Sequence, residues 1–277
     1  MSQYPLCYGQ GTDNVWDEAV ALVLGALYLP HDLPPAYAGA KLTPRERLKI
    51  TELFRRRCVE KVPVCYLVNR AFFAGMEFYV DEQVVIPRSP MAELIEQQFE
   101  PWVIPQAVER ILDLCTGSGC IAVACAAWFP HAMVDAVELS EAAFEIAQKN
   151  ISKHNAEEQI ELLLGDLYDP VQGRQYDLIV SNPPYVTSDE MNALPDEFRW
   201  EPDLGLAAGE NGLEIVREII EFAPNYLTEN GVLVCEVGFS RENLERHFAR
   251  LPFNWLDFER GGEGVFCLQK QDLIDHL

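Results

Sequence analysis

The sequence has few basic residues for its length. Its 277 residues include 21 lysines and arginines against 44 aspartates and glutamates, which gives a formal net charge of −23. Broad neutralisation of duplex phosphates needs clustered lysine and arginine, so the composition argues against a protein that holds DNA. A negative field favours a basic partner, whose approach it accelerates. Colloidal solubility alone would also account for the charge.

Signs of disulfides, metal sites and membrane segments are also absent. None of the eight cysteines forms a C-x-x-C pair, and no histidine stands at a metal-ligand spacing from one. Most cysteines lie in apolar contexts such as Cys120–Cys125, where a free thiol behaves as a small buried hydrophobe. Residues 1–7 lack the features of a signal peptide, and the longest apolar stretch, residues 19–30, is too short to cross a bilayer. We therefore expect a cytoplasmic protein with no metal and no membrane contact.

The N-terminal part of the chain has the pattern of helices joined by turns. An apolar helix is expected over residues 15–29, and Thr43 with Pro44 and Glu46 forms a capping-box pattern that opens a second helix. Residues 41–70 contain nine basic and three acidic residues, a local charge of +6 in an acidic chain. This stretch is either a solvated helix face or a surface that contacts RNA or an acidic partner.

From about residue 81 short apolar runs alternate with helical segments, which is the pattern of a doubly wound α/β sheet. Strands are expected over residues 110–115, 133–138, 160–164, 176–180 and 231–237, and helices over residues 121–128, 141–154, 213–226 and 241–248. A terminal hairpin that turns at residues 260–263 would end the sheet as a mixed one. We predict a small helical domain over residues 1–80 and an α/β domain over residues 81–277.

The first predicted strand of the α/β domain runs into a glycine-rich turn, Asp113–Gly119, that opens a helix. Gly117 and Gly119 let the backbone turn sharply and let a ligand approach closely. The helix N-terminus offers N–H groups to that ligand. Glu138 follows at the end of the next strand, where a carboxylate can accept both hydroxyls of a ribose. A nucleoside-containing cofactor is therefore expected outside the carboxyl ends of the strands.

These residues leave two cofactor classes open. Gly117–Ala122 also satisfies the dinucleotide fingerprint G-x-G-x-x-A, with an acid about 20 residues further on. An NAD-dependent dehydrogenase is the alternative at this point.

A stiff polar segment, Asn182–Tyr185, follows the strand expected over residues 176–180. Its two prolines fix their own backbone and restrict Asn182. The side-chain carbonyl of Asn182 and the backbone carbonyl of Pro183 can then accept both hydrogens of a planar –NH2 group, on which Tyr185 can stack. A dehydrogenase would leave these residues without a role.

These motifs resemble class I S-adenosylmethionine-dependent methyltransferases that act on planar amino groups, either on nucleic-acid bases or on a glutamine side chain in a protein. The chain is similar to the protein-glutamine N(5)-methyltransferase family in Phe78–Asp81, Ile86–Arg88, Glu201–Pro202 and Leu206–Gly212. Gly9–Asn14, Pro87–Pro90, and Cys115 with Cys120 are most like the branch that acts on large-subunit ribosomal protein three. The same reaction on peptide chain release factors is the alternative.

The resemblance implies a seven-stranded methyltransferase domain, S-adenosylmethionine as cofactor, and an N-terminal domain that recognises the protein substrate. The implied cofactor-binding residues are Asp113, Thr116, Gly117, Gly119, Glu138, Asp166, Leu167, Asn182 and Arg88. Asn182, Pro183 and Tyr185 would be catalytic and, with Pro184, would bind the substrate.

Two of these roles stay open, as does the form of the substrate. Asp113 would either order the glycine turn or receive the cofactor ammonium group. Arg88 would either clamp the cofactor carboxylate or support the segment before residue 90. The expected partner is a basic ribosomal protein, free or within an assembling large subunit, with a weak rRNA contact through residues 41–70.

Overall fold

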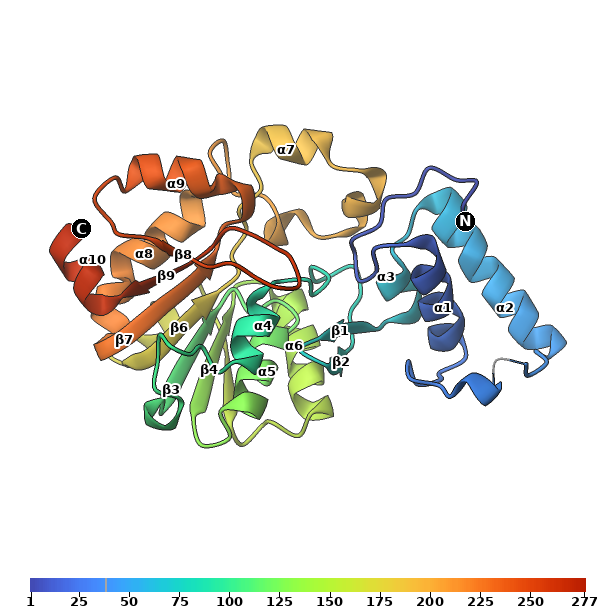
Figure 1. Ribbon diagram of the computed structural model, residues 1–277, viewed down its shortest axis with the longest axis horizontal. Helices are drawn as coiled ribbons and strands as arrows, with labels where there is room; N and C mark the ends of the chain where they lie inside the picture. Colours follow the sequence, from blue (N-terminus) through green and yellow to red (C-terminus); the bar gives the residue numbers. More distant parts are fainter. Residues whose placement is uncertain (38) are drawn as a thin grey trace.

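The computed structural model describes residues 1–37 and 39–277. A seven-stranded sheet lies between two layers of helices, and a group of N-terminal helices lies beside it (Figure 1). The strands are β3 (Arg110–Leu114), β4 (Met133–Glu138), β5 (Ile160–Leu164), β6 (Tyr176–Ser181), β7 (Leu227–Glu236), β8 (Asn254–Trp255) and β9 (Val265–Gln269). Their order is β5-β4-β3-β6-β7-β9-β8.

The sheet is parallel from β5 to β7, and β9 pairs antiparallel with both β7 and β8. The predicted doubly wound sheet with a mixed end is therefore confirmed. Strand order reverses at β3, since β4 and β5 lie on one side of it and β6 and β7 on the other. Such a switch point opens a crevice at the carboxyl ends of the strands.

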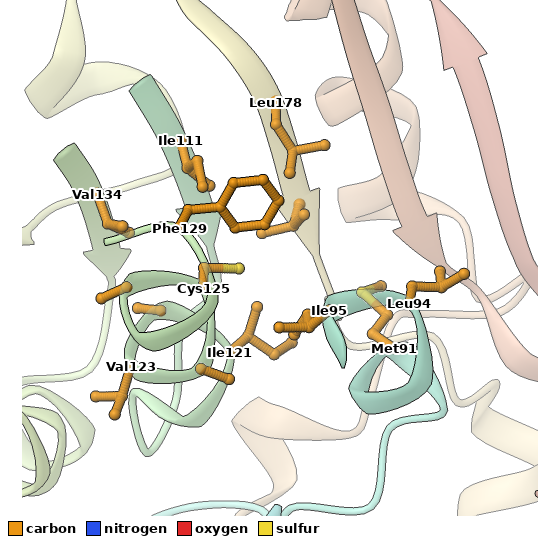
Figure 2. Close-up of a cluster of buried hydrophobic side chains, with 14 of the residues drawn as sticks. Met91, Leu94, Ile95, Ile111, Ile121, Val123, Cys125, Phe129, Val134 and Leu178 are labelled. Atoms are coloured by element: carbon orange, nitrogen blue, oxygen red, sulfur yellow. The ribbon is translucent and has the colours of Figure 1, made fainter. Parts of the chain in front are cut away.

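Alternate residues of each central strand pack into different hydrophobic cores, because successive side chains of a strand point to opposite faces of the sheet. Ile111 packs with α5 (Cys120–Trp128) and α4 (Met91–Glu96), whereas its neighbour Leu112 packs on the face covered by α8 (Glu214–Tyr226). Figure 2 shows the first core, where side chains of α4 and α5 meet those of the strands. Two buried apolar layers thus hold the sheet rigid beneath its carboxyl edge.

The remaining helices of this part are α6 (Glu141–Lys153), α7 (Ser188–Ala193), α9 (Arg241–His247) and α10 (Lys270–His276). Short helical turns occur at η3 (Pro105–Ala107), η4 (Asp169–Val171), η5 (Asp196–Trp200), η6 (Asp203–Gly205) and η7 (Gly238–Ser240). The four helices expected after residue 81 are found within one residue at each end. The short helices α4, α7 and α10, of six or seven residues, were not predicted.

The N-terminal helices are α1 (Val15–Ala26), α2 (Pro44–Arg55) and α3 (Val64–Val68), with the turn η1 at Pro35–Tyr37 and a π-helical turn, η2, at Arg56–Glu60. The capping box at the start of α2 is confirmed. The Glu46 N–H donates to Thr43 Oγ1 at 3.3 Å, and the Thr43 N–H donates to Glu46 Oε2 at 2.7 Å. Apolar side chains of the three helices form a small core of their own.

A two-stranded hairpin, β1 (Ala71–Phe73) with β2 (Met76–Phe78), joins the N-terminal helices to the large sheet domain. The sequence analysis missed it because three-residue strands show no alternation. Asn150 of α6 accepts from the Tyr79 N–H at 2.8 Å and donates to the Tyr79 carbonyl at 2.9 Å, which fixes the end of the hairpin. The proposed division near residue 80 stays a prediction, since the hairpin packs with the sheet domain.

A buried arginine fastens the N-terminal helices to the segment between β6 and α8. Arg57, which is 1% exposed, donates to both carboxylate oxygens of Glu18 on α1 at 3.1 Å and to Glu197 Oε1 on η5 at 3.2 Å. It also donates to the carbonyl of Cys7 at 2.7 Å. Figure 1 shows the N-terminal segment running beside the segment that carries α7. Arg57 therefore neutralises two buried acids from distant parts of the chain.

We predict that Arg57→Ala lowers the free energy of unfolding by about 3–5 kcal/mol, because two carboxylates are left buried without their cation. Urea unfolding measures the loss. Its neighbour Arg56 forms an exposed ion pair with Glu60 and provides the matched control, for which Arg56→Ala costs about 0–1 kcal/mol. Equal losses for the two variants would show that the buried cluster does not hold the parts together.

Candidate active site

The candidate site is a pocket at the carboxyl ends of β3, β4, β5, β6 and β7. Its wall consists of residues 83–89, 115–118, 120–121, 137–140, 165–167, 182–186 and 204–206, together with Ala143, Pro202, Ile215 and Glu236. Loops that follow five parallel strands thus meet the segment before α4 and the segment between β6 and α8. The expected cofactor-binding residues Thr116, Gly117, Glu138, Asp166, Leu167, Asn182 and Arg88 all lie in this wall.

Glu138 at the end of β4 is held by backbone donors on both sides. Its Oε2 accepts from the Gly117 N–H at 2.8 Å, and its Oε1 accepts from the Ser140 N–H at 2.9 Å. Burial raises the pKa of this carboxyl, and the two backbone hydrogen bonds act against that rise. The carboxylate is fixed at the pocket wall, and its remaining lone pairs are free to accept hydroxyl groups.

Asp113 and Gly119 do not reach the pocket wall. Asp113 is fully buried, and its Oδ2 accepts from Thr116 Oγ1 at 2.5 Å and from the Ala122 N–H at 3.0 Å. These contacts are consistent with ordering the turn, and the role of Asp113 toward the cofactor stays a prediction. Gly119 has φ +78° at the start of α5, and a Cβ there would lie 3.3 Å from Ala147 on α6. The glycine therefore allows α5 and α6 to pack closely.

The segment Asn182–Tyr185 lines the pocket directly after β6. The Ser181 hydroxyl donates to the Leu114 carbonyl at 2.8 Å, which locks the end of β6 to β3. All four residues of the segment face the same cavity as Glu138. The structure therefore brings the predicted amide-binding and ribose-binding groups together in one pocket.

Arg88 supports the segment before α4. Its Nη1 donates to both carboxylate oxygens of Glu201, at 3.0 and 2.7 Å, and to the Ile86 carbonyl at 3.1 Å. Glu201 also accepts from the Ile86 N–H at 3.0 Å and from Gln10 Nε2 at 2.5 Å. These contacts are consistent with support, and because Arg88 also lines the pocket, its role stays a prediction.

Sequence reasoning missed two polar residues of this site, Glu236 and Ser89. Both line the pocket, and Ser89 Oγ donates to Glu236 Oε2 at 2.5 Å. A signal for Glu236 was present, because it ends an apolar strand as Glu138 does. Ser89 lies within the Pro87–Pro90 motif of the sequence, and its role follows only from this contact.

Within residues 1–37 and 39–277, no group of three histidine, cysteine, aspartate or glutamate side chains is placed to hold a metal ion. Over the same residues, no helix has both the length and the apolar character needed to cross a membrane. All eight cysteines are free thiols.

Comparison with known proteins identifies the family. Residues 96–197 match the family model of the methyltransferase small domain. The chain is 48% identical over 271 residues to the ribosomal protein uL3 glutamine methyltransferase of Xanthomonas campestris, covering 98% of this chain and 88% of the relative. The chain belongs to this glutamine methyltransferase family. The relative of the same name from Xylella fastidiosa is 47% identical over 278 residues, covering 99% of this chain and 88% of that protein.

Solved structures support the fold. The hMettl16 catalytic domain in complex with an RNA hairpin has a TM-score of 0.56 at 17% identity, covering 82% of this chain and 81% of that one. A methyltransferase from Pyrococcus furiosus has a TM-score of 0.51 at 16% identity, covering 83% of this chain and 99% of that one. The predicted class I methyltransferase fold and family are thus confirmed, and the dehydrogenase alternative is excluded.

We predict a pH dependence of stability that arises from Asp113. Burial raises the pKa of this carboxyl from 3.8 to about 7, so the folded protein holds its proton more tightly than the unfolded chain. The contribution of Asp113 to the free energy of unfolding therefore falls as pH rises from about 4 to about 7, by at most about 1.4 kcal/mol per pH unit.

Asp113→Asn remains neutral throughout this range and isolates the effect. Urea unfolding at several pH values between about 5 and about 7 should show wild-type stability falling relative to that of the variant. A difference that stays constant with pH would mean that Asp113 is already ionised in the folded protein at the lowest of these pH values.

Proposed function

We propose that this chain transfers a methyl group from S-adenosylmethionine to the side-chain amide nitrogen of a glutamine in ribosomal protein uL3. One observation carries the proposal: the stiff segment Asn182–Tyr185 and the fixed carboxylate of Glu138 line one pocket at the switch point of the sheet. Membership in a family whose relatives are named uL3 glutamine methyltransferases supports the substrate.

The residues of the pocket fit the cofactor. Glu138 would accept the ribose hydroxyls, Asp166 and Leu167 would border the adenine, and Gly117 would pass close to the amino-acid part. Among the described residues, buried Ser118 Oγ has no hydrogen-bond partner, and Ser118 lines the pocket, so its hydroxyl would be available to this part. When bound, S-adenosylmethionine supplies a methyl group on a positively charged sulfur.

The chain's own residues would prepare the amide nitrogen, whose lone pair is delocalised into its carbonyl. The side-chain oxygen of Asn182 and the backbone carbonyl of Pro183 would accept its two hydrogens, while Tyr185 packs on the amide plane. These acceptors aim the nitrogen and stabilise the positive charge that develops on it. The nitrogen–carbon bond forms as the sulfur–carbon bond breaks, and the nitrogen then releases a proton to water.

The reaction needs no nucleophilic side chain. Cys115 lines the pocket, but burial raises the pKa of its thiol, so the thiol stays protonated and is a poor competitor for the methyl group. No general base is required before methyl transfer, because the nitrogen proton becomes acidic only afterwards.

The proposal extends to the partner and the compartment. A strongly basic ribosomal protein suits a chain of net charge −23, and free thiols at all eight cysteines suit the cytoplasm. We assign substrate recognition to the N-terminal helical domain, residues 1–80, which adjoins the pocket through the Arg57 and Glu201 contacts.

Within residues 41–70, the side chains that remain available for the proposed rRNA contact lie around the start of α2. Arg55 pairs with Glu52 at 2.8 Å and with Glu60 at 2.6 Å, and Arg57 is buried. Lys41, Arg45 and Arg47 are exposed. If uL3 is methylated within an assembling large subunit, these three side chains are the cations that would meet rRNA phosphates.

We predict that the purified protein with S-adenosylmethionine adds the mass of one methylene to a glutamine of uL3 and not to a class I release factor. Peptide mass spectrometry detects the addition and locates the glutamine. Offering uL3 both free and within an assembling large subunit shows which form is the substrate. Methylation of the release factor alone would overturn the proposed substrate and retain the chemistry.

Two substitutions should separate chemistry from cofactor binding. Asn182→Ala removes an acceptor for the amide and should lower kcat by about 10²–10³-fold, with the Kd for S-adenosylmethionine changed less than about 3-fold. Glu138→Ala should weaken cofactor binding by about 10–100-fold, because two ribose hydroxyls lose a charged acceptor. Calorimetry and single-turnover rates give the two quantities. Equal losses of affinity and rate in Asn182→Ala would contradict its role.

A further inference from the structure

A buried carboxylate that the chemistry above does not use lies behind the amide-binding segment. Glu236, the last residue of β7, is 5% exposed. Its Oε1 accepts from the Tyr185 hydroxyl at 2.8 Å, and its Oε2 accepts from Ser89 Oγ at 2.5 Å. Glu236 therefore joins two walls of the pocket that are far apart in the sequence.

Close contacts around Tyr185 leave its ring little freedom. The backbone carbonyl of Tyr185 accepts from Ser240 Oγ at 3.1 Å. Gly238 has φ +47°, and a Cβ there would lie 2.5 Å from the Tyr185 ring. The ring is thus pressed against backbone at one side, and the hydrogen bond to Glu236 fixes the hydroxyl at its end.

Ser89 is oriented to serve the same carboxylate. Its Oγ accepts from the Met91 N–H at 3.1 Å, so its own proton is directed to Glu236. An ionised carboxylate can accept from two hydroxyls at once, whereas a protonated carboxyl uses one oxygen as a donor. Burial raises the pKa of Glu236, and the hydrogen bonds from Ser89 and Tyr185 act against that rise. The hydroxyls of Ser89 and Tyr185 therefore favour the ionised carboxylate of Glu236, which accepts a hydrogen bond from each.

We propose that Glu236 is a positioning residue for methyl transfer: it holds the Tyr185 ring in place on one side and the Ile86–Pro90 segment, through Ser89, on the other. The inference rests on the proposed function, because Tyr185 is the residue that packs on the amide. Glu236 would act by fixing geometry, because a small displacement of a reacting group strongly lowers the rate of a transfer reaction.

The test is Glu236→Gln, which keeps the size of the side chain and removes the charge and one acceptor oxygen. We expect kcat on uL3 to fall about 10–100-fold, with the KM for uL3 and the Kd for S-adenosylmethionine changed less than about 3-fold. In a Tyr185→Phe background the same change should cost clearly less than in the wild type, because the bond to Tyr185 is already gone and only the bond to Ser89 remains to be weakened. The milder Ser89→Ala leaves the carboxylate in place and should show the same pattern with a smaller loss.

Asp135 offers a matched control within the chain. Its Oδ2 accepts from the Tyr176 hydroxyl at 2.6 Å, again a buried bond between a carboxylate and a tyrosine. This bond lies toward the opposite edge of the sheet, where β6 begins. Asp135→Asn should lower the melting temperature and leave kcat unchanged, which separates positioning from general loss of stability.

Hydrogen exchange gives a readout that needs no substrate. In Glu236→Gln, deuterium uptake should rise at residues 185–187 and at residues 86–91 together, and Asp135→Asn should leave both unchanged. If the wild-type chain does not methylate uL3, the proposed function fails while this measurement still decides the positioning. Unchanged uptake, wild-type kcat in Glu236→Gln, or an undiminished loss in the Tyr185→Phe background would each overturn the inference.

Discussion

The parallel pairing of β3, β4, β6 and β7 is the constraint on which the site depends. Strands that run in one direction end at one edge, and each of these strands ends in a polar residue or leads into one. Glu138, Asn182 and Glu236 are distant in the sequence, yet the sheet places all three in the wall of one pocket. The helices on both faces make that edge rigid, and chemistry that depends on alignment requires such rigidity.

Acids at strand ends must find partners, because an uncompensated buried charge is costly. Three acids at this edge of the sheet accept hydrogen bonds from different kinds of donor. Asp113 accepts from a hydroxyl of the glycine turn and from a backbone N–H of α5, Glu138 accepts from two backbone N–H groups, and Glu236 accepts from two side-chain hydroxyls. The partner determines the role: an acid tied to its own turn shapes the backbone, whereas an acid held at the pocket wall keeps lone pairs for a ligand. Glu236 holds groups that belong to two other segments, and so it sets their relative position.

Local patterns in the sequence were sufficient for the strands of the seven-stranded sheet, the long helices and the residues next to the glycine turn. Glu138 could be predicted because it ends a strand at a meaningful distance from Gly119, and Asn182 because two prolines follow it. The contacts of Ser89 with Glu236 and of Arg88 with Glu201 join residues 147 and 113 positions apart, so no local pattern encodes them. The basic stretch shows the same limit, since counting charges does not reveal which of its arginines are buried or paired.

A continuous polar path leads from the N-terminal segment to the amide-binding residues. Gln10 donates to Glu201, which also accepts from the Ile86 N–H, and three residues further along the chain Ser89 donates to Glu236, which accepts from Tyr185. The short segment between Ile86 and Ser89 therefore belongs to both clusters. A protein substrate must be gripped at one place and presented at another, and a rate that depends on alignment requires a fixed distance between the two. The hydrogen bonds of the consecutive residues Arg88 and Ser89, to Glu201 and Glu236, provide that fixed distance together with the apolar cluster that joins residues 62–71 to residues 80–86 and α6.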